Sequence, residues 1–300
     1  MIRPPIRSLA LCVGIALSWG SSSQSALAAS ASECRRLATV NTDTMPDGRI
    51  KIPVMLEDRP LSFLVDTGGI STTIKWEEAR ALGLPVRQSI RKLTGVGGSM
   101  LNFTVSGEKF SIGELRVRNA PIYVETRPLS GADGTLGPDI LRNYDVEIDF
   151  ARGSLSLVLP DRCAGADQAG STVIAMDVAQ NGHVRIPVKI DGKTLIATLD
   201  TGATISVISM QAAALLSIYP SSPELTLVRD TGPYRIYAYP FQTLEIGGVS
   251  VKNPRIAIAS DRFLPELGAD LVLGIDALRQ MHVTIAYGQN RLYIRGSEAN

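Results

Sequence analysis

One sequence unit occurs twice in this chain, and this duplication constrains the fold more than any other feature. Residues 48–54 (GRIKIPV) align with residues 182–188 (GHVRIPV) at an offset of 182 − 48 = 134. Further along, Leu136-Gly137 aligns with Leu273-Gly274 at an offset of 274 − 137 = 137, so about three extra residues lie between the two matching blocks of the second copy. The chain is therefore expected to contain two copies of one fold.

Short apolar runs separated by turn residues dominate both copies and predict strands. In the first copy, residues 51–56 and 61–65 form a candidate hairpin across residues 57–60, and the second copy has a strong turn signal at Asp191-Gly192-Lys193. Short helices are expected at residues 76–82 and 210–216, and again after each Leu-Gly pair. We expect a mainly β fold of two similar, pseudo-symmetric β-barrel-like lobes.

The N-terminus is typical of a secretion signal. Arg3 and Arg7 precede an apolar run, Leu9–Trp19, and Ala26-Leu27-Ala28 fits a cleavage site. The alternative is a retained anchor, but eleven residues at ~1.5 Å each cover about half of a ~30 Å bilayer core. We expect a periplasmic or secreted protein, free of the membrane after cleavage, with these parts: signal peptide 1–28, N-terminal extension 29–45, first lobe 46–160, linker 161–171 and second lobe 172–297.

Charge and residue counts exclude several classes of function. Thirty basic and 29 acidic residues give a net charge of +1, so a basic face for nucleic acid is not expected. With only two histidines and three cysteines, the chain has few ligands for a four-ligand Cys/His zinc site, and such a site is not expected unless carboxylates contribute. We expect no metal and no cofactor. Cys34 and Cys163 form a disulfide or remain two thiols, and the sequence leaves both possibilities open.

Two Asp-Thr-Gly triplets occupy the same place in the two copies. Asp66-Thr67-Gly68 and Asp200-Thr201-Gly202 are 134 residues apart, and each follows an apolar strand and begins a tight loop. A third triplet, Asp230-Thr231-Gly232, has no partner, because 230 − 134 = 96 falls on Val96. We therefore interpret the third triplet as a turn.

Packing two lobes about a pseudo-twofold axis brings equivalent loops face to face. Two carboxyls within hydrogen-bonding distance share one proton, because ionising both is costly. The ionised member can take a proton from water, and the protonated member can donate one to a carbonyl oxygen. The pair Asp66 and Asp200 thus indicates amide hydrolysis without metal or covalent intermediate. The alternative is that each aspartate only forms an Asx turn.

The paired triplets, each followed by an apolar-apolar-Gly element, resemble the retropepsin- and pepsin-like aspartic peptidases. Those elements are Thr135-Leu136-Gly137 and Val272-Leu273-Gly274, with Thr135 replacing one apolar residue. The first copy, with LTGVGGS at 93–99 and GTLGPDIL at 134–141, is most similar to the bacterial retropepsin-like aspartyl protease domain. The resemblance covers about 48–160 and 172–297 and implies the bilobal aspartic protease fold. It also implies roles for the triplets: Asp66 and Asp200 catalytic, with Thr67, Gly68, Thr201 and Gly202 supporting the dyad.

The Gly-rich segment Gly95-Val96-Gly97-Gly98-Ser99 is the candidate flap over a substrate. The second copy has LVRDTGPY at the corresponding place, so which lobe supplies the flap stays open. Gly69 and Ala203 follow the triplets where pepsin-like members commonly carry Ser or Thr, which predicts a mildly acidic rather than strongly acidic pH optimum.

The leading hypothesis is a monomeric aspartic endopeptidase that acts on polypeptides. One alternative is a peptide-binding protein with a vestigial dyad. Another is a chain whose lobes pair between two copies, so that homodimerisation completes each site.

Overall fold

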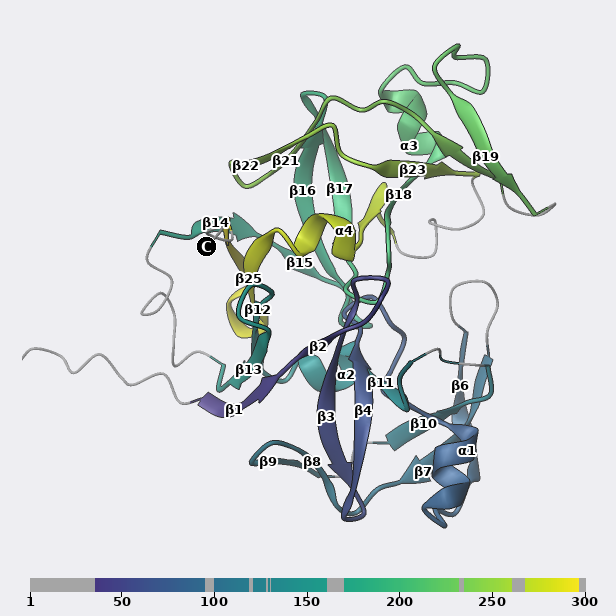
Figure 1. Ribbon diagram of the computed structural model, residues 1–300, viewed down its shortest axis with the longest axis vertical. Coiled ribbons are helices and arrows are strands. Elements are labelled where there is room, and N and C mark those ends of the chain that lie inside the picture. Colours follow the sequence, from purple (N-terminus) through teal and green to yellow (C-terminus); the bar gives the residue numbers. More distant parts are fainter. Residues whose placement is uncertain are drawn as a thin grey trace, which may run out of the picture. The chain divides into compact units, whose positions relative to one another are not determined.

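Strands make up most of the residues that the structure describes, as the short apolar runs predicted (Figure 1). The computed structural model describes residues 36–94, 100–118, 121–127, 129, 131–160, 170–231, 235–260 and 268–296. The expected signal peptide, the candidate flap Gly95–Ser99, Cys34 and Cys163 lie outside the described residues. Among the described residues, no helix has the length and apolar character needed to cross a membrane.

The first copy forms a ten-stranded sheet. Its strand order is β6-β7-β10-β5-β11-β4-β3-β8-β9, with β2 paired to β3. Its strands are β2 (Asp43–Thr44), β3 (Ile50–Leu56), β4 (Arg59–Val65), β5 (Thr73–Lys75), β6 (Arg87–Thr94), β7 (Met100–Ser106), β8 (Phe110–Ile112), β9 (Leu115–Val117), β10 (Pro121–Glu125) and β11 (Gly134–Leu136). The two predicted helices are α1 (Trp76–Ala81) and α2 (Pro138–Leu141).

The second copy forms a second ten-stranded sheet with the same connectivity. Its order, β19-β20-β23-β18-β24-β17-β16-β21-β22 with β15 paired to β16, matches the first sheet strand for strand. Its strands are β15 (Asp177–Val178), β16 (Val184–Ile190), β17 (Lys193–Leu199), β18 (Ser206–Ser209), β19 (Thr226–Asp230), β20 (Arg235–Ala238), β21 (Thr243–Ile246), β22 (Val249–Lys252), β23 (Ile256–Ala259) and β24 (Leu271–Leu273). Helices α3 (Met210–Leu215) and α4 (Ile275–Leu278) complete the match and confirm the predicted two-lobed β fold.

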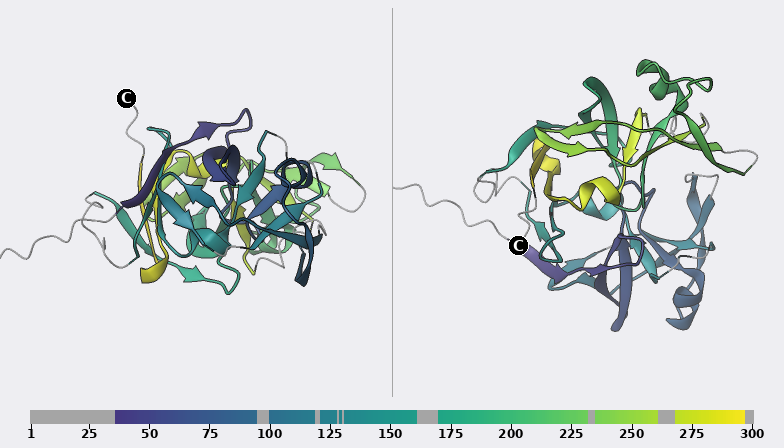
Figure 2. Two further views of the ribbon diagram at one scale, coloured as in Figure 1. Left: turned by 90° about the horizontal axis from the view of Figure 1, so that it is seen from below. Right: turned by 45° about the horizontal axis from the view of Figure 1, so that its top comes forward.

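A third, six-stranded sheet joins the two copies and was not predicted from the sequence. Its order is β1-β13-β12-β25-β26-β14, and the central antiparallel pair β12–β25 takes one strand from each copy (Figure 2). Its strands are β1 (Arg36–Asn41), β12 (Asp145–Asp149), β13 (Ser154–Val158), β14 (Thr172–Ala175), β25 (Met281–Ala286) and β26 (Arg291–Gly296), and the short 3₁₀ helix η3 (Tyr287–Gln289) connects the last two. The segment expected as an N-terminal extension therefore contributes an edge strand, β1, to this shared sheet.

In the first copy, the turn of the first hairpin is shorter than the predicted segment 57–60. Residues Glu57 and Asp58 form a two-residue turn with φ of 49° and 64°, and Asp191 and Gly192 form its counterpart with φ of 47° and 80°. Two-residue turns with positive φ match the right-handed twist of the flanking strands. Pro60, expected in the turn, instead pairs with Met55 inside the hairpin.

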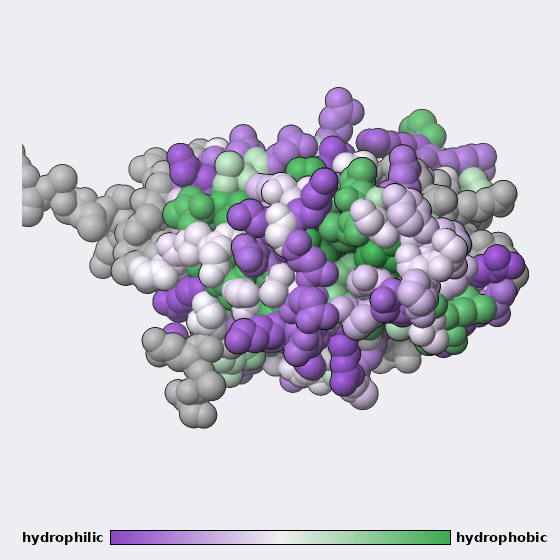
Figure 3. Space-filling model, turned by 90° about the horizontal axis from the view of Figure 1, so that it is seen from above, coloured by the Kyte–Doolittle hydropathy of each residue, from purple (hydrophilic) through white to green (hydrophobic). Residues whose placement is uncertain are grey.

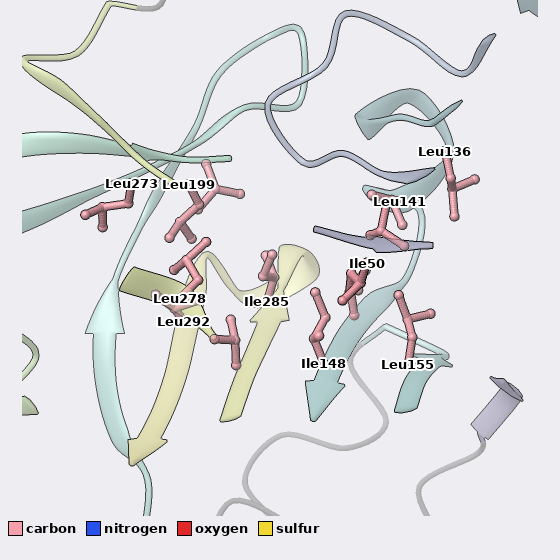
Figure 4. Packing of buried hydrophobic residues seen from close by; sticks show 14 of the residues in the cluster. Ile50, Leu136, Leu141, Ile148, Leu155, Leu199, Leu273, Leu278, Ile285 and Leu292 are labelled. Carbon is pink, nitrogen blue, oxygen red and sulfur yellow. The ribbon is translucent and has the colours of Figure 1, made fainter. Parts of the chain in front are cut away.

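One hydrophobic core runs through both lobes and the shared sheet. Figure 4 shows residues of this cluster from the two copies close to one another, including Leu199, Leu278 and Ile285 from the second and Ile50 and Ile148 from the first. Each of these five side chains is at most 3% exposed. Because the two lobes share this core, the loops that carry the two triplets are supported by the same packed residues.

Candidate active site

A parallel strand pair holds each aspartate at the end of a buried strand. Strand β4 pairs in parallel with β11, and the Asp66 amide donates to the Leu136 carbonyl over 3.0 Å. Strand β17 pairs in parallel with β24, and the Asp200 amide donates to the Leu273 carbonyl over 2.9 Å. The apolar-apolar-Gly elements identified in the sequence therefore support the two triplets from alongside.

Four hydrogen bonds tie the two triplets to each other across the lobes. The Thr67 hydroxyl donates to the Leu199 carbonyl (2.9 Å), and the Thr201 hydroxyl donates to the Val65 carbonyl (2.7 Å). Each hydroxyl oxygen also accepts from the backbone amide of the other threonine, over 3.1 Å in both directions. Both threonines are almost fully buried. Because buried hydrogen bonds of this kind are strong and geometrically specific, they fix the two loops relative to each other.

The two triplet glycines let the opposite carboxyl approach their backbone. A Cβ added to Gly68 would lie 2.3 Å from Asp200 Cγ, and a Cβ added to Gly202 would lie 2.4 Å from Asp66 Cγ. No side chain fits at such distances, so both positions require glycine. The reciprocal contact places the Asp66 and Asp200 carboxyls side by side within one chain.

The electrostatic surroundings of the two carboxyls differ. Burial, then the charge of Asp200 and a hydrogen bond between the two side chains, raise the pKa of Asp66 well above its usual range. Burial also raises the pKa of Asp200, but hydrogen bonds from Asp66 and from two backbone amides oppose the rise. Those amides, of Gly202 and Ala203, donate to Asp200 Oδ1 over 2.9 and 3.0 Å. Asp66 Oδ1 accepts from the Gly68 amide over 3.2 Å, the longest of these three bonds. More backbone amides therefore donate to the Asp200 carboxyl than to the Asp66 carboxyl, which favours the charged form at Asp200.

Two further acidic residues, which the sequence analysis missed, anchor the segments that follow the triplets. Asp139 accepts from the Ser71 hydroxyl (2.6 Å) and from the Thr72 amide and hydroxyl (2.7 and 2.8 Å). Asp276 accepts from the Ser206 hydroxyl (2.8 Å) in the second lobe. The signal was present in the sequence, because 276 − 139 = 137 is the offset of the Leu-Gly pairs.

Two basic side chains reach from one lobe to the triplet loop of the other, and these were also missed. Arg49 Nη1 donates to the Gly202 carbonyl over 3.4 Å. His183 Nε2 lies 2.9 Å from the Gly69 carbonyl oxygen. These residues occupy equivalent positions, since 183 − 49 = 134, but a difference in residue type at one repeat position gives no signal of contact.

The remaining predicted residues belong to the equivalent hairpins β6–β7 and β19–β20 or lie outside the described residues. Asp230 of the third triplet ends β19 and pairs with Arg235 of β20. The candidate flap Gly95–Ser99 falls between β6 and β7, which pair antiparallel. Within the described part of the chain, no group of three or more His, Cys, Asp or Glu side chains is arranged to hold a metal ion.

Both lobes carry an exposed hairpin at the corresponding place, β6–β7 and β19–β20. Large apolar side chains on these hairpins are exposed, among them Ile90, Met100, Leu227 and Val228. On the face shown in Figure 3, hydrophobic side chains likewise lie in patches among hydrophilic ones. Exposed large apolar side chains on two equivalent hairpins are candidates for contact with another chain.

Comparison with known proteins supports the fold and the family. A family model described as aspartyl protease matches residues 52–140, and one described as gag-polyprotein aspartyl protease matches residues 186–280. A search of curated proteins found no significant match. Similar solved structures include the aspartic proteinase from Irpex lacteus, with a TM-score of 0.57 and 14% identity over 87% of this chain and 97% of that one.

Two basic 7S globulins have the same fold. Basic 7S globulin from soybean gives a TM-score of 0.52 and 9% identity over 87% of this chain and 95% of that one. Conglutin gamma from lupine seeds gives a TM-score of 0.54 and 10% identity over 89% of this chain and 96% of that one. With an aspartyl protease domain matched in each half and a pepsin-like bilobal fold over the whole, the chain belongs with the retropepsin- and pepsin-like aspartic peptidases.

Proposed function

We propose that this protein is an aspartic endopeptidase that hydrolyses peptide bonds with a water molecule activated between Asp66 and Asp200. One observation carries the proposal. Each triplet glycine admits the opposite carboxyl at a distance no side chain would allow, and the threonine bonds hold the two loops in that arrangement. A packed core would not otherwise retain two adjacent carboxyls, because their mutual repulsion and desolvation cost free energy.

The different surroundings of the two carboxyls assign their roles. Ionised Asp200 accepts a proton from the water, and the water oxygen attacks the carbonyl carbon of the substrate. Protonated Asp66 donates its proton to the carbonyl oxygen, which produces a neutral tetrahedral diol. As the C–N bond breaks, Asp200 returns its proton to the leaving nitrogen and Asp66 recovers a proton from one diol hydroxyl. The dyad ends in its starting state, so no metal or cofactor enters the cycle.

The expected partner is a polypeptide substrate, with neither nucleic acid nor membrane as a binding partner of the mature chain. The exposed apolar residues on the two hairpins are suited to contact substrate side chains, and an extended peptide pairs readily with strand edges. We propose that the protein acts as a monomer, because the four threonine bonds form within one chain. Periplasmic or secreted localisation follows only from the N-terminal sequence pattern.

A mixed peptide library incubated with the mature protein tests this function directly. We expect endoproteolytic cleavage that a statine-type inhibitor suppresses, because statine presents a tetrahedral hydroxyl to a carboxyl dyad. The cleavage sites, read by mass spectrometry, define the subsite preference. Folded protein that cleaves no peptide between pH 3 and pH 8 would instead favour a peptide-binding protein with a vestigial dyad.

The pH optimum is expected to be mildly acidic. Activity needs one proton on the dyad, so it falls at low pH as Asp200 becomes protonated and at high pH as Asp66 loses its proton. Burial raises both pKa values, and Gly69 and Ala203 have no hydroxyl to stabilise the charged forms, so both limbs move to higher pH. A kcat profile over pH 3–8 measures this, and a maximum below about pH 3.5 would contradict it.

A further inference from the structure

The carbonyl that follows each triplet is bonded differently in the two lobes. In the second lobe, the Ala203 carbonyl accepts from the backbone amide of Ile275 over 2.8 Å, a bond within that lobe. Gly69 is the equivalent of Ala203, since 203 − 69 = 134, and Pro138 is the equivalent of Ile275, since 275 − 138 = 137. Proline has no backbone N–H, so the first lobe lacks the donor that the second lobe uses.

A side chain from the opposite lobe takes the place of the missing donor. His183 Nε2 lies 2.9 Å from the Gly69 carbonyl oxygen, and only 5% of His183 is exposed. A carbonyl oxygen only accepts hydrogen bonds, so Nε2 carries the proton. Arg49 is the equivalent residue of the first lobe. Because the Ala203 carbonyl already accepts from a backbone amide, Arg49 donates to the neighbouring Gly202 carbonyl, over 3.4 Å.

The neighbouring Asn181 fixes the protonation of the His183 ring. Asn181 Oδ1 accepts from the His183 backbone amide over 3.2 Å, which orients the side-chain amide. Its Nδ2 then faces His183 Nδ1 at 3.0 Å and donates to it. With Nδ1 accepting and Nε2 donating, the arrangement selects the tautomer that carries its proton on Nε2. Two residues of the second lobe are thus arranged to present one donor to the first lobe.

The Gly69 backbone lies directly against one of the two carboxyls. A Cβ added to Gly69 would lie 2.8 Å from Asp66 Oδ2, so a shift of this backbone displaces the Asp66 side chain. We propose that His183, held by Asn181, is a positioning residue that replaces the backbone donor lost at Pro138 and holds the Gly69 loop so that Asp66 is aligned for catalysis. The inference rests on the proposed peptidase function and adds to it a residue outside the triplets.

A compensating pair of substitutions tests this role. His183→Leu removes the donor, and we expect kcat to fall about tenfold to a hundredfold while KM changes less than about twofold. His183→Gln, whose amide can place a donor near the position of Nε2, should keep most of the activity. Pro138→Ala restores a backbone N–H at the position where Ile275 has one, so His183→Leu combined with Pro138→Ala should recover most of the lost kcat. Alanine is chosen because the Pro138 Cβ lies close to Gly182, so a side chain longer than one carbon has little room there.

His282→Leu is the matched control, because His282 is the only other histidine and lies on β25 of the shared sheet. Its kcat should stay within about twofold of wild type. Unchanged kcat in folded His183→Leu, or no recovery with Pro138→Ala, would overturn the proposal.

Histidine ¹⁵N NMR of the wild-type protein gives a readout that does not depend on activity. We expect the Nε2–H tautomer for His183, and an Nδ1–H tautomer with an unprotonated Nε2 would overturn the proposal even if His183→Leu failed to fold. Absence of all cleavage by a wild-type protein that shows this tautomer would refute the peptidase function, and the hydrogen bond to Gly69 would stand without a catalytic role.

Discussion

Asp66→Asn and Asp200→Asn are each expected to lower kcat by about 10²- to 10⁴-fold, the range that general acid–base groups contribute. Asparagine has nearly the shape of aspartate, but it neither takes a proton from water nor supplies one to the carbonyl oxygen. Steady-state cleavage of a peptide found in the library measures the effect. Asp58→Asn is the matched control, because it changes an exposed aspartate in the β3–β4 turn and should leave kcat within about twofold of wild type.

Stability separates loss of chemistry from loss of fold in these variants. The pKa of Asp66 is raised on folding, so this group favours the folded state while protonated, and that contribution is lost as pH rises through the folded pKa. Wild type therefore loses stability as pH rises from the ordinary aspartate pKa toward the raised pKa of Asp66, whereas Asp66→Asn lacks this titration and its unfolding temperature should depend less on pH over that range. A folded Asp66→Asn protein with activity near wild type would refute the assignment of the dyad.

Mixing the two variants tests whether the dyad forms within one chain. If Asp66 and Asp200 of the same chain form the site, co-refolded Asp66→Asn and Asp200→Asn proteins recover no activity. In a reciprocal dimer, one intact pair would form and cleavage would return. If each lobe paired with its own kind, Asp200→Asn alone would keep a working Asp66 pair. The four threonine bonds within one chain predict the first result.

Gly68→Ala and Gly202→Ala are each expected to lower kcat about 10²-fold, because the added methyl group displaces the opposite carboxyl. The methyl carbon would lie 2.3 Å from Asp200 Cγ in the first variant and 2.4 Å from Asp66 Cγ in the second, far inside van der Waals contact. Forcing the two loops apart should also lower the free energy of unfolding by about 1–3 kcal/mol. Cleavage kinetics and urea unfolding of the same preparations measure the two effects.

Gly296→Ala controls for the loss of a glycine as such, because a Cβ added there has no heavy atom within 4 Å. Its unfolding free energy should stay within about 0.5 kcal/mol of wild type. Full activity in Gly68→Ala or Gly202→Ala would mean that the carboxyls are not held against the opposite loop.

The repeat in the sequence anticipated much of the fold. Matching at constant offset identified two copies, and short apolar runs with turn residues between them located the hairpins β3–β4 and β16–β17 that lead to the triplets. The short helices were predicted because glycine and proline mark their ends locally, as at Gly83 and Pro138. The six-stranded sheet was not anticipated, because pairing β12 with β25 joins residues such as Val146 and Ile285 that are far apart in the chain. Strand periodicity gives the face that a residue occupies and not its partner strand.

By itself, the sequence determined that two equivalent loops each carry Asp-Thr-Gly after a buried strand, because a duplicated pattern preserves local conformation in both copies. Only the tertiary structure decided how the copies differ. It placed two backbone amides on Asp200 and one on Asp66, and it brought His183 to the Gly69 carbonyl that Pro138 leaves without a backbone donor. The physical reason is that a hydrogen bond depends on distances of a few tenths of an ångström between atoms from different lobes. The spacing of residues along one chain does not contain that information.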